Sequence, residues 1–235
     1  MLRALFATTI LAIASAAAQN PDPAKIMEGT RIATTLQQSD LHGNLSKNGT
    51  KTPVHLFLRG KDIQFAYDSG GTTQRFHLRL GDGKYDLFDV GADGKTTIFP
   101  ASKLTSPIAG TDLTYEDLSF QFFYWPDPKL EGTESVGGQE CYKIRLNKPA
   151  GSGGRYAVVY VWVHTKQGAF MRVRGFDKSG AMLKEFQVDE IMSVGNGVYT
   201  LKKMTVSSMA GDRRTGVTTL LFDKPQDAGG PKGLR

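Results

Sequence analysis

The residue types best suited to catalysis do not form a recognisable constellation along this sequence. A serine nucleophile needs a positioned base and an oriented third group. The segment Asp68-Ser-Gly-Gly71 contains a candidate serine nucleophile, but Tyr67 and not Gly precedes it, and Thr72 and not Pro follows it. None of the four histidines sits in a recognisable partner motif. A turn is the simpler interpretation of this segment. A hydrolase is therefore the weakest of the functions considered, and we predict no catalytic residues.

Two pairs of adjacent carboxylates, Glu116-Asp117 and Asp189-Glu190, could in principle serve as acid and base. Neighbours on a strand point to opposite faces, so the second pair would not converge if its strand continues. The first pair suits the positive end of a helix dipole. We expect Glu116 and Asp117 to mark the start of a helix rather than a reaction centre.

Metal and phosphate motifs are also missing from the sequence. The histidines show no spacing typical of a metal site, such as His-x-x-x-His. The segment Gly151-Ser-Gly-Gly154 lacks the Gly-Lys-Ser/Thr ending of a phosphate loop and precedes a strand, which favours a flexible hairpin. We predict no metal and no cofactor.

The strongest lead is the strand Tyr156–His164, which is apolar on both faces. An antiparallel sheet in water usually has one polar face, so both faces of this strand must be covered. An ordinary sandwich core would cover it, and so would a cavity for an acyl chain. For the second alternative we expect one face of the strand, together with an aromatic helical region before it, to line the cavity. The candidate lining residues are Leu118, Phe122, Trp125, Val158, Tyr160 and Trp162.

Around this strand the sequence predicts a mainly β protein of about ten or eleven strands with two helices. Alternating apolar residues and Asp-Gly or Lys-x-Gly turns indicate an antiparallel meander. Helical spacing is expected from Ile26 to Gln38 and from Leu113 to Phe123, the latter ended by Trp125-Pro126. The expected strands are 54–58, 63–67, 75–80, 85–89, 96–99, 140–146, 155–164, 169–176, 182–188, 198–206 and 214–222.

The first residues have the pattern of an export signal. A positive start at Arg3 precedes an apolar run, and Ala16-Ala17-Ala18 supplies small residues for cleavage. We predict a signal peptide at 1–18, one domain at 19–225, a flexible tail at 226–235, and a periplasmic location. Cys141 is the one cysteine, so no internal disulfide and no lipidated first residue is expected. We expect Cys141 to be a small core residue.

Composition limits the classes of partner. The 235 residues carry a formal net charge of +6, with a sequence pI near 9.3. The basic residues are dispersed, which argues against nucleic-acid binding and predicts solubility with weak attraction to anionic surfaces.

A family resemblance adds to this interpretation. Gly110-Thr-Asp-Leu-Thr-Tyr-Glu-Asp-Leu-Ser119 resembles a segment of exported outer-membrane lipoprotein-sorting proteins, and the resemblance continues to about residue 225. Further matching segments are Trp162-Val-His-Thr165, Phe170-Met-Arg-Val-Arg174, Asp177-Lys-Ser-Gly180, Leu183-Lys-Glu-Phe186, Lys202-Lys-Met204 and Thr215-Gly-Val-Thr218.

The resemblance implies a fold like that of the periplasmic carrier LolA: a strongly curved antiparallel sheet forming an unclosed half-barrel, plugged by short helices. It implies a carrier that is not an enzyme and binds lipid or lipoprotein acyl chains, a monomer in transient contact with membranes. Its protein partners would be an inner-membrane exporter and an outer-membrane acceptor. The alternative is an envelope sensor or scaffold that uses the same fold to bind proteins.

Overall fold

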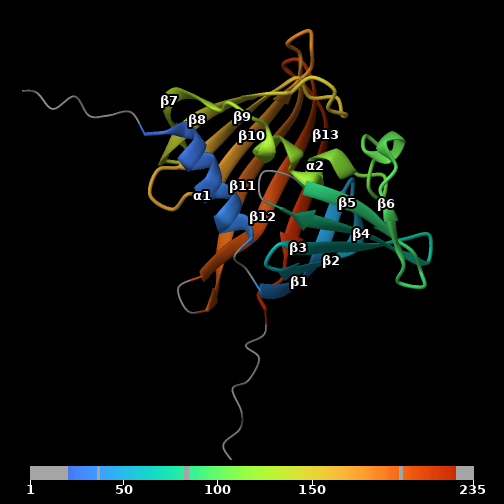
Figure 1. The fold of residues 1–235 in the computed structure, drawn as a ribbon. Coiled ribbons are helices and arrows are strands. Elements are labelled where there is room, and N and C mark those ends of the chain that lie inside the picture. The colour runs from blue at the N-terminus through green and yellow to red at the C-terminus, as the bar shows by residue number, and fades with distance from the viewer. Residues whose placement is uncertain (1–20, 36–37, 82–84, 196–197, 226–235) are drawn as a thin grey trace, which may run out of the picture.

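The computed structural model describes residues 21–35, 38–81, 85–195 and 198–225. The signal peptide and the tail predicted from the sequence lie outside these residues. Within them the chain forms one antiparallel sheet of thirteen strands, accompanied by short helices (Figure 1). The predicted fold class, an unclosed half-barrel, is confirmed.

The strands follow one another as a meander, except that the first and last strands, β1 and β13, pair with each other in the middle of the sheet. The order is β6-β5-β4-β3-β2-β1-β13-β12-β11-β10-β9-β8-β7, so β6 and β7 are the edges. The strands are β1 (Gln38–Lys47), β2 (Thr50–Arg59), β3 (Asp62–Ser69), β4 (Thr72–Leu80), β5 (Tyr85–Val90), β6 (Thr96–Ile98), β7 (Lys129–Val136), β8 (Gln139–Asn147), β9 (Val158–His164), β10 (Phe170–Phe176), β11 (Met182–Gly195), β12 (Val198–Ala210) and β13 (Arg213–Phe222).

The predicted count of ten or eleven strands is too low, because the predicted set omits β1 and β7. β1 and β2 meet at Asn48 and Gly49, whose φ angles of 49° and 81° form a tight hairpin turn. The strand β7 is an edge strand whose residues are mostly exposed, so it carries almost no apolar alternation.

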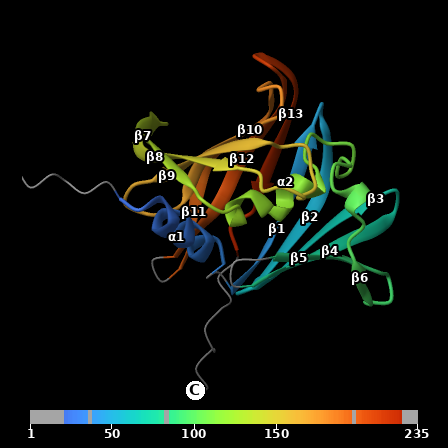
Figure 2. The same cartoon turned by 45° about the horizontal axis from the view of Figure 1, so that its top comes forward.

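Four helical segments accompany the sheet. They are α1 (Pro23–Thr35), the 3₁₀ turn η1 (Ala101–Lys103), α2 (Tyr115–Ser119) and the 3₁₀ turn η2 (Gln121–Tyr124). The helix predicted up to Phe123 is broken at Phe120, which has a left-handed φ of 46°. We call residues 101–125 the plug segment. In Figure 2, α1 and the plug segment both lie inside the curve of the sheet.

The main core lies between the concave face of the sheet and the plug segment. It contains Phe122, Phe123 and Trp125 of the plug, packed with inward side chains from both halves of the sheet. The strand β9 contributes Val159, Val161 and Val163 to this core. One curved sheet therefore folds around one helical insert.

Candidate ligand cavity

A cavity of about 830 Å³ remains on the concave side of the sheet. Pockets of about 300–1,000 Å³ are typical of small-molecule sites, and mostly apolar walls are typical as well. The walls come from α1, the plug segment and both halves of the sheet. Apolar lining residues include Leu41, Leu56, Phe65, Leu78, Leu118, Phe120, Phe123, Phe170, Leu201, Met204, Leu220 and Phe222.

Of the six residues predicted to line a cavity, the structure places only Leu118 in this wall. Phe122 and Trp125 are buried in the core beside it, with exposed fractions of 0% and 6%. Val158, Tyr160 and Trp162 alternate with the valines that face the core, so they lie on the convex side. Their contact with a ligand stays a prediction, and the structure favours the opposite face of β9.

The convex side of β9 is covered by cations. Trp162 is 2% exposed, and the cationic groups of Lys143, Arg172 and Arg174 lie 5.4–5.7 Å from its ring centroid. Its indole nitrogen donates to Glu134 Oε2 at 2.8 Å. Long basic side chains shield apolar surface with their stems and keep their charges in water. This arrangement explains how a strand can be apolar on both faces of an open sheet.

Cys141 belongs to the same convex cluster. It packs with Val136 and Trp162 and is fully buried, as predicted for a small core residue. Burial raises the pKa of its thiol.

Polar side chains also line the cavity, among them Arg31 and His164. Arg31 of α1 donates from Nη1 to the Phe123 carbonyl oxygen at 2.8 Å and stacks over the Tyr124 ring. On the other side, the His164 ring accepts from the backbone N–H groups of Lys166 and Gln167. These contacts connect α1 to the plug segment and fix the β9–β10 turn.

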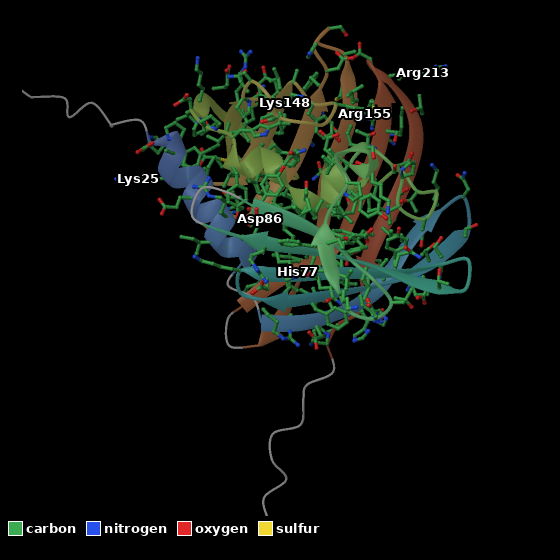
Figure 3. The ribbon with its side chains drawn as sticks, turned by 45° about the vertical axis from the view of Figure 1, so that its right-hand side comes forward. Lys25, His77, Asp86, Lys148, Arg155 and Arg213 are labelled. Carbon is green, nitrogen blue, oxygen red and sulfur yellow. The ribbon has the colours of Figure 1, made fainter. Side chains whose placement is uncertain are left out.

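The plug segment is anchored by its two adjacent carboxylates. Thr114 caps α2 in a capping box with Asp117, which confirms the predicted helix start. Glu116 accepts from the backbone N–H of Arg155, which is labelled in Figure 3, at 2.9 Å. Asp117 accepts from the Tyr156 hydroxyl. Both carboxylates are buried, so they hold α2 against the segment that leads into β9.

Cations and hydroxyls of the sheet complete the anchor. Lys184 of β11 is 2% exposed, with its Nζ 3.5 Å from Asp117 Oδ2. Asp112 accepts from Lys47 Nζ at 3.1 Å and from Thr218 Oγ1 at 2.9 Å. The plug is thereby connected to β1, β11 and β13.

Two glycines make room for this anchor. A Cβ on Gly154 would lie 1.9 Å from Glu116 Oε1, and a Cβ on Gly175 would lie 2.4 Å from the Tyr156 ring. Gly154 also has a φ of +86°. The sequence suggested only a hairpin loop for Gly151–Gly154, because the close approach depends on residues nearly forty positions away.

Burial raises the pKa of Glu116 above its ordinary value. The folded protein therefore holds this proton more tightly than the unfolded chain, and Glu116 costs stability as pH rises through the interval between its two pKa values. We expect the difference in unfolding free energy, wild type minus Glu116→Gln, to fall as pH rises from about 4. Urea unfolding at a series of pH values tests this, and a difference that grows with pH would contradict it.

The other candidate motifs have structural roles. Asp68-Ser-Gly-Gly71 forms the β3–β4 turn, as predicted, with Thr73 Oγ1 donating to Asp68 at 2.8 Å. Asp189 accepts from Thr205, whereas Glu190 pairs with Lys202, so the two carboxylates serve different partners. Among the residues that the structure describes, no three His, Cys, Asp or Glu side chains group in a way that could hold a metal ion.

No helix in the described part of the chain is both long enough and apolar enough to cross a membrane.

Comparisons with known proteins agree with this architecture. A family model described as "Uncharacterized protein" matches residues 91–226, more than half of the chain. No curated protein matches the sequence.

Solved structures share the fold at low sequence identity. A DUF1329 family protein from Desulfovibrio piger is 18% identical, with a TM-score of 0.65 over 89% of this chain and 95% of that one. A putative outer membrane lipoprotein-sorting protein domain from Vibrio parahaemolyticus is 16% identical, with a TM-score of 0.67 over 89% and 94%. A LolA superfamily protein from Nitrosomonas europaea is 14% identical, with a TM-score of 0.61 over 87% and 94%.

Proposed function

We propose that this chain, which belongs to the family whose model matches residues 91–226 and shares the fold of a LolA superfamily protein, is a periplasmic carrier of lipid or lipoprotein acyl chains. The observation that supports the proposal is the cavity of about 830 Å³ on the concave side of the sheet. Its wall is mainly aliphatic and aromatic, so it offers an acyl chain an apolar environment. Burial of each methylene contributes about 0.8 kcal/mol.

The polar side chains in the cavity wall fit a ligand with one polar end. Arg31 offers a cation beside the apolar wall, and it also connects α1 to the plug segment through the Phe123 carbonyl. A chain that enters by displacing α1 would break that hydrogen bond. A lipid carrier requires no catalytic group, and we assign none.

The direct experiment is lipid analysis of the protein purified from the periplasm. We expect native mass spectra to show bound lipid and the purified protein to take up a fluorescent fatty acid. Repeated absence of lipid together with no uptake would overturn the carrier proposal and leave the sensor or scaffold class.

Filling the cavity should block uptake. Ala169 is half-buried, precedes β10 and lines the cavity, so Ala169→Trp would place an indole in the space meant for the ligand. We expect fatty-acid affinity to fall by about tenfold, which corresponds to about 1.4 kcal/mol. Fluorescence titration measures the change.

Ala181→Trp is the matched control for this substitution. Ala181 is also half-buried and precedes β11, and its carbonyl accepts a turn hydrogen bond as that of Ala169 does. It does not line the cavity. Equal loss of uptake in both variants would show that the effect comes from the fold and not from the cavity.

A further inference from the structure

The net positive charge of the protein lies in its C-terminal half. Residues 126–225 contain 15 Lys and Arg against 10 Asp and Glu, a net charge of +5. Residues 20–125 contain 11 against 12, a net charge of −1. The positive charge in excess of the negative charge is therefore carried by the part of the chain that forms β7 to β13.

Part of this excess gathers on the convex face of β7–β10, which we call the basic face. Its cations alternate with the inward residues of these strands, and Lys143, Arg172 and Arg174 surround Trp162. The basic face consists of Lys129, Lys143, Arg145, Arg172 and Arg174.

Three carboxylates offset part of this charge. Glu134 pairs with Lys143 at 2.7 Å and Glu185 pairs with Arg174 at 2.6 Å, while Glu131 lies in the β7 bulge at the edge. The paired cations stay accessible, since the side chains of Lys143 and Arg174 are 27% and 36% exposed. The basic face keeps a net positive charge in contact with solvent.

One pair on this face is unfavourable for folding. Lys129 and Arg145 are direct cross-strand partners, and neither forms an ion pair with any residue in the described ranges. Like charges directly opposite one another destabilise a sheet. Folding does not explain why two cations stand opposite each other here.

We propose that the basic face docks the protein on a bilayer surface that carries anionic headgroups. The cations come from three strands, β7, β8 and β10, on either side of β9. A convex surface with cations spread in this way suits a laterally continuous anion layer better than a single acidic side chain. Each Lys or Arg near such a surface contributes through long-range attraction that salt screens. The docking does not depend on what the cavity holds.

The test is binding to vesicles in a co-sedimentation assay. Wild-type protein is expected to bind vesicles of equal parts phosphatidylglycerol and phosphatidylcholine, and not vesicles of phosphatidylcholine alone. Binding is expected to be lost at about 1 M NaCl, where the screening length is about 3 Å. Equal binding to both kinds of vesicle would overturn the proposal.

The decisive variant is Lys129→Gln with Arg145→Gln. Affinity for the anionic vesicles is expected to fall about fivefold for each lost cation, hence roughly 25-fold. The melting temperature should not fall, because a like-charge pair is removed. Unchanged vesicle affinity in this variant would overturn the proposal.

Two further readouts separate docking from folding and from ligand uptake. Lys51→Gln with Lys95→Gln removes the same charge from exposed sites in the N-terminal half, and this control is expected to retain vesicle affinity. Fatty-acid uptake should be the same in both double variants. If the wild-type protein takes up no fatty acid but still binds the anionic vesicles, the carrier proposal is contradicted. The proposal that the basic face docks on membranes is not.

Discussion

Replacing Lys184 by methionine is expected to lower the free energy of unfolding by about 3–5 kcal/mol. Lys184 is 2% exposed and Asp117 is 0% exposed, so the substitution leaves a carboxylate buried without its cation. Lys184 Nζ also donates to the Asp112 carbonyl oxygen and, at 3.3 Å, to Ser208 Oγ. The variant therefore loses an ion pair and two hydrogen bonds while keeping an apolar side chain of similar length. Urea unfolding measures the change.

Lys202→Met is the matched control. Lys202 Nζ lies 2.6 Å from Glu190, but the two side chains are 42% and 46% exposed. Exposed ion pairs typically contribute about 0–1 kcal/mol. Equal losses in the Lys184 and Lys202 variants would contradict the view that the buried pair anchors the plug segment.

A second variant keeps the test usable if Lys184→Met does not fold. Lys184→Met combined with Asp117→Asn also removes the carboxylate that Lys184→Met leaves without its cation. This double variant should be more stable than Lys184→Met alone, because replacing both members of a buried pair removes the uncompensated charge.

The meander was predictable because its signals are local. Alternating apolar residues and turn dipeptides lie within a few positions of each other, and Glu116-Asp117 next to Thr114 is enough to predict a helix start. The edge strand β7 has no such signal, because a strand exposed along most of its length needs no apolar alternation.

The orientation of β9 could not be predicted from its own residues. Both of its faces are apolar, so period-two alternation does not show which face is concave. The structure resolves this through neighbouring strands: Lys143 of β8 and Arg172 of β10 are the cross-strand partners of Trp162. The register that brings them together is set across the sheet, so the residues of β9 alone do not show that Trp162 lies beneath cations.

The same limit applies to the plug segment. Phe120, Phe122 and Phe123 follow one another closely, and helical spacing alone does not separate core from cavity wall. The left-handed residue Phe120 changes the direction of the chain, so Phe123 faces the cavity while Phe122 points into the core.

Replacing Phe122 by alanine is expected to cost about 3–5 kcal/mol of unfolding free energy, the usual range for a buried aromatic side chain. Its ring is fully buried, with the Phe123, Tyr156 and Trp125 ring centroids 5.0, 6.3 and 6.4 Å away. The substitution leaves a void among rings that the sheet and the plug segment hold in place. Thermal and urea unfolding measure this loss.

Phe123→Ala separates packing from binding, because Phe123 is also buried but lines the cavity. Both variants should lose stability, whereas only Phe123→Ala removes wall surface that a ligand would contact. Measured at a temperature where both variants are folded, fatty-acid affinity should stay near the wild-type value in Phe122→Ala and weaken in Phe123→Ala. The reverse order of affinities would place Phe122 in the binding wall, as the sequence alone had indicated, and would require the plug segment to rotate when ligand enters.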